Sequence, residues 1–345
     1  MVKMSHPIRI NIASESEISV KGHGVHTAYE EMARALEKHD DVEVIRGHFS
    51  DAVDCDVIHL HTIGMRAVRK LLQRGPKKVV SVHVVPDSFI GSVVGARYWR
   101  FAASIYMRLF YNKADLLLAV SEETKKDLLA MRITKPIVVE YNSIDTHKYQ
   151  TVSSDARIGV RKQLGIESGA FVVMGAGQVQ PRKRLDSFIA CAKALPDVTF
   201  VWVGGMPFGK LAADSAHMDK LIKSAPSNML FPGIVDLQSM PDYYTAADMF
   251  FLPSDQETFG LVILEAAAAG LPVMVRLLDD YADSFGDDVL QCSETDFSAN
   301  IQRLRDDRRF YEERQGRSAV LAARFDSAAA ADRYVALYKD LIANE

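Results

Sequence analysis

Short apolar runs alternate with longer amphipathic stretches from one end of the chain to the other. Runs such as Leu116–Val120 and Met249–Leu252 have the length and composition of strands that are buried on both faces of a sheet. Between such runs, stretches such as Val25–Lys38 repeat apolar residues every three or four positions, which predicts helices that pack one face on a core. Strands that alternate with helices in this way predict an α/β fold with mainly parallel sheets.

The alternation occurs in two series, separated by a polar segment without periodicity at Tyr149–Gly159 that we interpret as a linker. The first series contains the expected strands Ile8–Ala13, Val42–Arg46, Val57–Leu60, Lys78–His83, Leu116–Val120 and Ile137–Val139, and the expected helices Val25–Lys38, Met65–Gln73, Ala96–Tyr111 and Glu122–Ala130. The second contains the expected strands Phe171–Gly175, Thr199–Val203, Met229–Phe231, Met249–Leu252 and Pro272–Val275, and the expected helices Arg184–Ala194, Lys210–Ser224, Met240–Ala247, Leu261–Gly270, Asp296–Glu312 and Ser327–Ala343. We therefore expect two doubly wound, Rossmann-like domains, residues 1–150 and 151–326, that face a cleft in which a ligand binds.

The bulk properties agree with two domains and narrow the setting. A chain of 345 residues is too long for one typical core. Its three cysteines, Cys55, Cys191 and Cys292, are far apart, and no Cys/His group has the spacing of a zinc site, so we expect a reduced, cytoplasmic setting and no metal. The N-terminal residues lack the apolar core of a signal peptide, and no uncharged apolar run reaches the roughly 18 residues that a membrane-spanning helix requires.

Positive charge is concentrated in the first half of the chain. Between Met65 and Lys113 there are ten Lys or Arg residues and a single acid, Asp87, which gives a net charge of +9, whereas the whole chain has a net charge of −4. Such a block indicates a surface that meets an anionic partner.

Two glutamates eight positions apart, Glu257 and Glu265, carry the clearest chemical signal. Glu257 follows an expected strand, and Glu265 lies in the helix that comes next. Ligands of open α/β sheets gather at the carboxyl ends of strands, where carboxylates can accept hydrogen bonds from sugar or ribose hydroxyls and a helix N-terminus can hold phosphate. The alternative interpretation is that Glu257 caps the helix and Glu265 is a solvated helix residue.

A glycine-rich turn with adjacent cations opens the first helix of the second domain. The turn runs from Gly175 to Gly177, and Arg182, Lys183 and Arg184 follow it. Arginine binds a diphosphate as a two-pronged donor and lysine binds it as a point charge. A basic, solvated helix start explains the same residues, so this alternative stays open.

Histidines follow or occupy two strands of the first domain. His83 comes at the end of an expected strand, just before a proline turn, and a lone histidine in such a place is most often structural. His59 and His61 alternate along another strand and raise the possibility of a metal. Because no carboxylate or cysteine lies at ligand spacing, we favour a strand end near the cleft.

From Gly22 to Val275, about three-quarters of the chain, these features resemble in order the retaining nucleotide-sugar glycosyltransferases of the GT-B fold, whose signature is two glutamates separated by seven residues. The stretch Arg276–Tyr281 resembles the bacterial glycolipid branch of that family, which includes diacylglycerol glucosyltransferases. The resemblance implies that the last helix, within residues 327–345, packs back on the first domain.

The resemblance also implies roles for individual residues. Glu257 would hold the donor sugar, Glu265 the ribose hydroxyls, and Lys183 the leaving diphosphate. Gln178 stands where many members carry arginine, and Arg184 where many carry glycine, which makes Arg182 the substitute for the missing arginine. His83 would hydrogen-bond the transferred hexose, and the turns that border the nucleotide or its diphosphate would contain Gly22, Gly24, Gly177, Gly204, Gly233, Phe259, Gly260 and Leu261. No cofactor is expected besides the UDP-sugar substrate, and catalysis would be metal-independent.

The acceptor would bind largely in the first domain, where the basic block lies. In the expected helix Ala96–Tyr111, Arg97, Arg100, Ser104 and Arg108 share one face, and aromatic residues cover much of the remainder. Basic charge beside exposed aromatic residues is typical of a helix that lies on an anionic membrane. In the alternative, the helix is an ordinary amphipathic one whose aromatic residues belong to the core. Nucleic acid is disfavoured because the second domain is acidic and no nucleic-acid motif is present.

The sequence therefore predicts a retaining hexosyltransferase that moves glucose from UDP-glucose to diacylglycerol on the inner face of the cell membrane. A galactosyltransferase, or a transferase with a soluble or polysaccharide acceptor, is the nearest alternative. A GT-B-like binding protein without catalytic activity is the alternative from another functional class.

Overall fold

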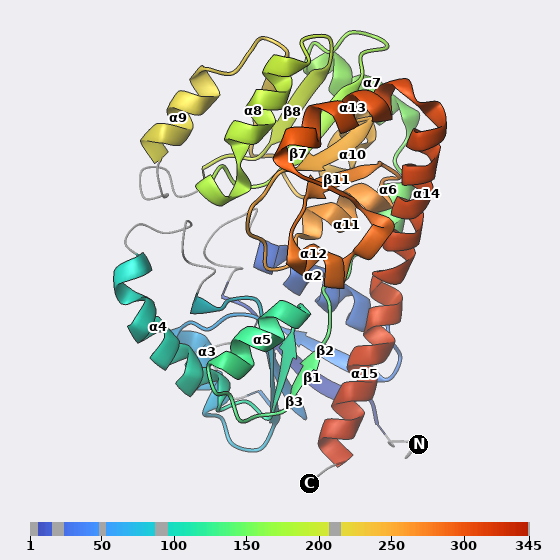
Figure 1. Cartoon of the computed structure of the whole chain (residues 1–345). Helices are drawn as coiled ribbons and strands as arrows, with labels where there is room; N and C mark the ends of the chain where they lie inside the picture. Colours follow the sequence, from blue (N-terminus) through green and yellow to red (C-terminus); the bar gives the residue numbers. More distant parts are fainter. Residues whose placement is uncertain (1–5, 16–23, 48–52, 87–95, 207–214, 344–345) are drawn as a thin grey trace. The chain divides into compact units, whose positions relative to one another are not determined.

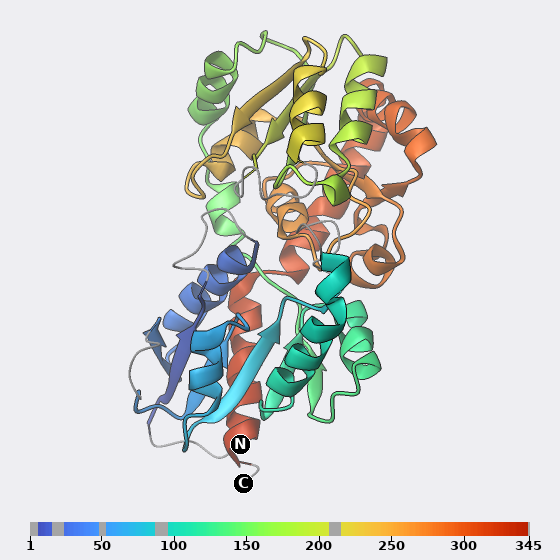
Figure 2. The same cartoon turned by 90° about the vertical axis from the view of Figure 1, so that its left-hand side faces the viewer.

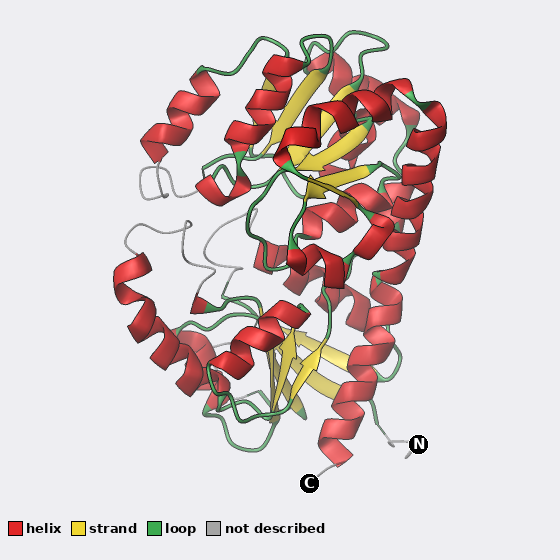
Figure 3. Ribbon diagram, viewed as in Figure 1, coloured by secondary structure: helices red, strands yellow, loops and turns green. Residues whose placement is uncertain are grey.

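The computed structural model describes residues 6–15, 24–47, 53–86, 96–206 and 215–343 (Figure 1). Contacts within the chain divide it into two compact units, unit 1 (Met1–Phe89, Arg97–Asp145 and Phe325–Glu345) and unit 2 (Ile90–Ala96 and Thr146–Arg324). Each unit has a six-stranded parallel sheet with helices on both faces (Figure 3). The predicted α/β architecture of two doubly wound sheets is confirmed.

Unit 1 has the strand order β2-β1-β3-β4-β5-β6. Its strands are β1 (Ile8–Ala13), β2 (Val42–Arg46), β3 (Val57–Leu60), β4 (Lys77–Val82), β5 (Leu116–Ala119) and β6 (Ile137–Val139). Its helices are α2 (Gly24–Glu37), α3 (Met65–Leu71), α4 (Ala96–Tyr111), α5 (Glu122–Ala130) and α15 (Ser327–Ala343).

The alternation of side chains along these strands builds two cores. On one face, Ile10, Ile12 and Val57 pack with α2 and the C-terminal helix α15, which contact each other (Figure 2). On the other face, Ile58 and Leu60 pack with α3, α4 and α5. Because successive residues of a strand point to opposite faces, residues 57, 59 and 61 lie on the α2/α15 side.

Unit 2 has the strand order β12-β11-β10-β7-β8-β9. Its strands are β7 (Val172–Ala176), β8 (Thr199–Val203), β9 (Met229–Gly233), β10 (Met249–Leu252), β11 (Val273–Arg276) and β12 (Leu290–Cys292). Its α-helices are α6 (His147–Gln150), α7 (Ser154–Gln163), α8 (Leu185–Ala194), α9 (Ser215–Lys223), α10 (Met240–Ala246), α11 (Leu261–Ala268), α12 (Asp279–Ser284), α13 (Phe297–Asp306) and α14 (Arg308–Arg324), and short 3₁₀ turns lie at Pro181–Lys183, Gly286–Asp288 and Glu294–Asp296. Since all of these strands are parallel, the loops that follow β7, β8, β9 and β10 meet at one edge.

Three expectations of the local structure were wrong. The supposed linker becomes helical at Ser154, where the hydroxyl of Ser153 accepts a hydrogen bond from the amide of Ala156. The single helix expected at 296–312 is two helices, because Asp307 is extended and its carboxylate caps the second one at Phe310. The short strand β12 was not expected at all.

Candidate active site

Glycines shape the carboxyl edge of the sheet in unit 2. Gly177 follows β7, Gly204 follows β8 and Gly233 ends β9, and all three have positive φ angles. The amide of Gly204 donates to the carbonyl of Gly233, and a Cβ on Gly204 would lie only 2.0 Å from the carbonyl oxygen of Gly177. Any larger residue at position 204 would therefore collide with the turn after β7.

A buried cluster of three charges lies at the same edge. Glu257, in the loop after β10, accepts a hydrogen bond of 2.5 Å from the ammonium group of Lys183, and Arg182 approaches its other oxygen at 3.3 Å. Arg182 also donates to the backbone carbonyl of Gln256 and to the side chain of Gln180. The exposed fractions of Lys183 and Glu257 are 7% and 9%.

The charges in this cluster determine its protonation. Burial opposes ionisation of Glu257, but the positive charges of Lys183 and Arg182 outweigh it and lower the pKa of Glu257 to about 2. Burial also lowers the pKa of Lys183, and the charge of Glu257 offsets part of that effect. The pair is therefore an ion pair, with Arg182 as a second cation.

Glu265 lies about one turn into α11 and faces the protein, not the solvent. It is 5% exposed and accepts a 2.7 Å hydrogen bond from the hydroxyl of Tyr244 on α10. Burial, together with the charge of Glu265, raises the pKa of Tyr244 well above its ordinary value, so the hydroxyl remains a donor. The helix start at Gly260 has no side-chain cap, so the alternative roles of Glu257 as a cap and Glu265 as a solvated residue are both wrong.

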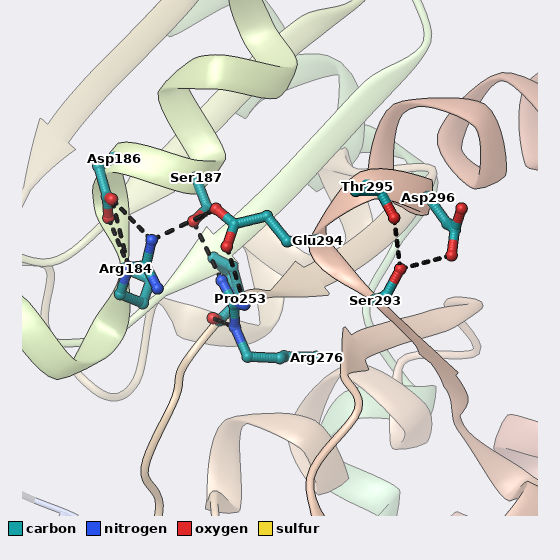
Figure 4. Close-up of polar contacts among 9 residues, drawn as sticks. All are labelled: Arg184, Asp186, Ser187, Pro253, Arg276, Ser293, Glu294, Thr295 and Asp296. Carbon is teal, nitrogen blue, oxygen red and sulfur yellow. Dashed lines mark hydrogen bonds and ion pairs between the residues drawn. The ribbon is translucent and has the colours of Figure 1, made fainter.

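A network of ion pairs and hydrogen bonds connects neighbouring segments at the same sheet edge of unit 2. Arg184 pairs with Asp186, and Glu294 accepts hydrogen bonds from Ser187 and Arg276 (Figure 4). These residues come from the segments after β7 and β12 and from the end of β11, and Arg276 also donates to the carbonyl of Pro253 after β10. The φ angle of Arg184 is 50°, a left-handed conformation that favours glycine, so this arginine occupies a backbone position that glycine would adopt without strain.

In unit 1, His83 lies just after β4 and pairs with another histidine. Its Nε2 atom is 3.0 Å from Nδ1 of His61, which follows β3. Gly24 is the first residue of α2 and is exposed, whereas Gly22 lies outside the described residues. The structure therefore places His83 and Gly24 in unit 1 and brings Gly177, Arg182, Lys183, Glu257 and Glu265 to the sheet edge of unit 2.

Two family models match the chain. The one described as glycosyl transferases group 1 matches residues 170–307, and the one described as glycosyltransferase family 4 matches residues 42–148. The α-galactosylglucosyldiacylglycerol synthase of Streptococcus pneumoniae is 35% identical over 277 residues, which cover 79% of this chain and 74% of that protein. The processive diacylglycerol α-glucosyltransferase of Acholeplasma laidlawii is 30% identical over 283 residues, which cover 80% of this chain and 81% of that protein.

The chain belongs to the group 1 glycosyltransferases. The crystal structure of Anabaena Alr3699/HepE in complex with UDP and glucose has the same fold, with a TM-score of 0.76 and 20% identity over 96% of this chain and all of that one. The predicted resemblance to GT-B glycosyltransferases of the glycolipid branch is thereby confirmed.

The glycosyltransferase has an apolar stripe on α4. Phe101, Ile105 and Leu109 are exposed at four-residue spacing, with Phe101 79% and Leu109 66% exposed. Phe110 and Tyr111 are buried in the core, so the interpretation of the aromatic residues as core is correct for that face of the helix. Exposed aliphatic residues lie on α3 and just after it as well, at Met65 and Leu72.

Only some of the basic residues between Met65 and Lys113 are exposed at the surface of the glycosyltransferase. Arg66, Arg69, Arg74 and Arg108 are exposed. Lys70, which belongs to the same basic block, is buried, because it is only 2% exposed. Its aliphatic chain and ammonium group are therefore unavailable to an external partner.

Two features of the described residues bear on cofactors and membranes. No group of three or more His, Cys, Asp or Glu side chains in those residues is arranged to hold a metal ion. Among the helices in the same ranges, none combines the length and apolarity that are needed to cross a bilayer.

Sequence reasoning missed several residues that support the site. Tyr244 holds Glu265, and Arg276 and Glu294 connect the loops around the charge cluster. The sequence indicates His61 as a strand-end residue or a metal ligand, whereas in the structure it contacts His83 directly. The signal for His61 was present, because residues 59, 61, 81 and 83 all fall on one face of two neighbouring strands.

Proposed function

We propose that this glycosyltransferase moves glucose from UDP-glucose to diacylglycerol with retention of configuration, so that the product is an α-glucosyl diacylglycerol. The ion cluster of Glu257, Lys183 and Arg182 is the observation that carries the proposal, because it sets a buried acid and two cations at a glycine-shaped sheet edge. The name of the Acholeplasma laidlawii relative, a processive diacylglycerol α-glucosyltransferase, supports this sugar and this lipid.

The donor would use each group of the site in unit 2. Glu257 would accept hydrogen bonds from hydroxyls of the hexose, and Glu265, held by Tyr244, would accept those of the ribose. The turns at Gly177 and Gly204, which follow β7 and β8, would border the diphosphate. His83 in unit 1 would hydrogen-bond the transferred hexose.

Catalysis would depend on positive charge that is in place before the donor arrives. As the bond between the sugar and the diphosphate breaks, negative charge accumulates on the leaving phosphate, and Lys183 and Arg182 would stabilise it. Fixed charges of this kind are often the largest single contribution to catalysis. In the retaining reaction that we propose, the leaving phosphate takes the acceptor's hydroxyl proton on the same face, so no separate protein nucleophile and no metal ion are required.

The lipid acceptor would be reached from the membrane surface. The exposed apolar residues Phe101, Ile105 and Leu109 on α4 would enter the interfacial region of the bilayer. Tyr106 donates a hydrogen bond to the carbonyl of Ile63, just before α3, so the arginines of α3 lie near the same helix. Each exposed arginine near an anionic surface adds roughly 1 kcal/mol of attraction, which supports attachment to the inner face of the cell membrane.

A galactosyltransferase is the second candidate, and one observation favours it. The Streptococcus pneumoniae relative is named as an α-galactosylglucosyldiacylglycerol synthase and is 35% identical to this chain. Galactose differs from glucose at one hydroxyl, so a single contact to the sugar could decide between the two donors.

The proposal is tested by supplying both sugars and both acceptors. The purified protein is incubated with radiolabelled UDP-glucose or UDP-galactose and vesicles that contain diacylglycerol or glucosyl diacylglycerol. Labelled glucosyl diacylglycerol with a small anomeric proton coupling would support α-glucosyl transfer. Transfer of galactose alone would favour the second candidate. The absence of both sugar transfer and donor hydrolysis would indicate a binding protein.

A further inference from the structure

Three histidine rings form a buried column on one face of the first sheet. The rings of His59 and His61 are stacked with centroids 4.9 Å apart, and those of His61 and His83 are stacked at 5.1 Å. His59 and His61 come from β3 and its end, and His83 follows β4, the neighbouring strand. The column therefore extends from the core to the carboxyl edge of the sheet.

The inner end of the column is fixed by hydrogen bonds. Nδ1 of His59 lies 2.6 Å from the hydroxyl of Tyr338 on α15, and its Nε2 lies 2.8 Å from the hydroxyl of Ser81 on β4. Hydrogen bonds at both nitrogens hold the orientation of this ring, and His61 stacks on it. Tyr29, on α2, makes an edge-to-face contact with His61, with ring centroids 5.6 Å apart.

The surroundings keep His61 neutral. Its side chain is 3% exposed, and burial, with the neighbouring histidines, holds the pKa of His61 well below its ordinary value. A neutral imidazole carries one proton, so one ring nitrogen donates and the other accepts. The position of that proton decides what His61 can offer to His83.

The proton can be placed from the hydrogen bonds of His61. Among the residues that the structure describes, its buried Nε2 atom has no hydrogen-bond partner, whereas its Nδ1 atom is 3.0 Å from Nε2 of His83. A buried N–H without a partner is rarer in proteins than a buried acceptor without one. The proton therefore belongs on Nδ1 of His61, from which it is donated to Nε2 of His83.

We propose that His61 is a positioning residue that fixes the orientation of His83 and makes it an Nδ1–H tautomer. His83 accepts at Nε2, so its Nδ1 atom carries the proton, and any group that Nδ1 meets must accept a hydrogen bond. A sugar hydroxyl oxygen is such an acceptor. The part of this inference that concerns the hexose rests on the proposed function, whereas the tautomer does not.

The tautomer can be measured directly. Long-range proton–nitrogen NMR spectra of protein with ¹⁵N-labelled histidine distinguish the two neutral tautomers, and a His83→Asn variant assigns the signals. We expect the Nδ1–H form of His83 in the wild-type protein. The Nε2–H form would overturn the proposal, whatever the activity of the protein.

Two variants of His61 separate positioning from packing. In His61→Asn the amide nitrogen occupies the place of Nδ1 and can still donate, whereas His61→Leu fills the space without a donor. Groups that orient a functional histidine at metal sites are worth about 10- to 100-fold, and we expect a loss of kcat/KM in that range for leucine only. Asparagine should keep kcat/KM within about threefold and preserve the Nδ1–H signal of His83.

The remaining outcomes are equally decisive. We expect His61→Leu to keep a melting temperature near that of the wild type, because it also removes an unsatisfied buried nitrogen. Equal loss of kcat/KM in both variants, or an unchanged His83 signal in His61→Leu, would overturn the proposal. If the leucine variant does not fold, the wild-type spectrum alone decides the question. Wild-type protein with the expected tautomer but no sugar transfer would overturn the proposed function and leave the pairing of the two histidines supported.

Discussion

Replacing Lys183 by methionine tests the charge cluster, because methionine has a similar length and no charge. The pKa of Glu257 is about 2 against an ordinary value of 4.5, which corresponds to roughly 3 kcal/mol of stability at neutral pH. Lys183 is the larger of the two cationic contributions, and Arg182 remains in the variant. We therefore expect a stability loss of about 2–3 kcal/mol, or about 3–4 °C in Tm for a chain of this size.

The same variant should lose much more activity than stability. Removal of one preorganised charge at a transition state typically costs about 10²- to 10³-fold in kcat, and we expect at least this loss of sugar transfer, measured with radiolabelled UDP-sugar and lipid vesicles. Lys193→Met, at an exposed position on α8, is the matched control and should change neither quantity.

A double variant separates the two effects. Lys183→Met with Glu257→Gln removes both charges, so no unpaired carboxylate stays buried, and most of the lost stability should return while transfer remains absent. Transfer by Lys183→Met within tenfold of the wild type would refute the assignment of this lysine to the diphosphate. A double variant as unstable as the single one would refute the ion-pair argument.

Acid titration gives an independent measure of the same pair. The folded-state pKa of Glu257 is depressed, so its contribution is fully present above its unfolded value of about 4.5 and is lost as pH falls towards about 2. Chemical denaturation at pH 6 and pH 3 should therefore show a smaller pH-dependent loss in the double variant than in the wild type. Equal losses would contradict the depressed pKa.

Two further predictions concern the nucleoside and the membrane. Tyr244→Phe removes the hydroxyl that holds Glu265. Because one hydrogen bond contributes about 1 kcal/mol, we expect KM for the UDP-sugar to rise severalfold with a smaller change in kcat. An unchanged KM would refute the role of Glu265 in binding the donor. Replacing Phe101 and Leu109 together by glutamine should reduce flotation with anionic vesicles, whereas glutamine at Leu129, which is also exposed but lies on α5, should not. Equal flotation of all three proteins would place the membrane contact elsewhere.

Much of the fold was predictable because the hydrophobic pattern is unambiguous where strands are buried on both faces. The strands Val57–Leu60 and Met249–Leu252 occur at their predicted residues. Helix α7 was missed because its packing uses arginine instead of apolar residues. Arg157 and Arg161 donate to backbone carbonyls at the end of α10 and to Asp248. These charged side chains therefore attach α7 to the rest of unit 2, a role that an apolar helix face usually has.

The site was predictable in its location but not in its internal contacts. Strand ends and glycines indicate the correct edge of the sheet, since parallel strands bring all of their carboxyl ends together. The contact between Lys183 and Glu257 joins residues 74 positions apart and depends on the short turn at Pro181–Lys183, which ends in the left-handed Arg184. No periodicity in the sequence predicts such a turn. The burial of Lys70 is likewise a tertiary effect, because lysine is almost never fully buried and its residue type therefore predicts exposure.

The charge cluster also suggests why the acid and the cations belong together in the proposed reaction. Without donor, Glu257 neutralises one of the two cations, and the cluster keeps a net charge of +1 in a buried place where an unpaired lysine would be costly. A diphosphate that binds there would compete with Glu257 for Lys183 and Arg182. The carboxylate oxygens would then become available as acceptors for sugar hydroxyls, so that recognition of the diphosphate and recognition of the sugar would be coupled through one ion pair.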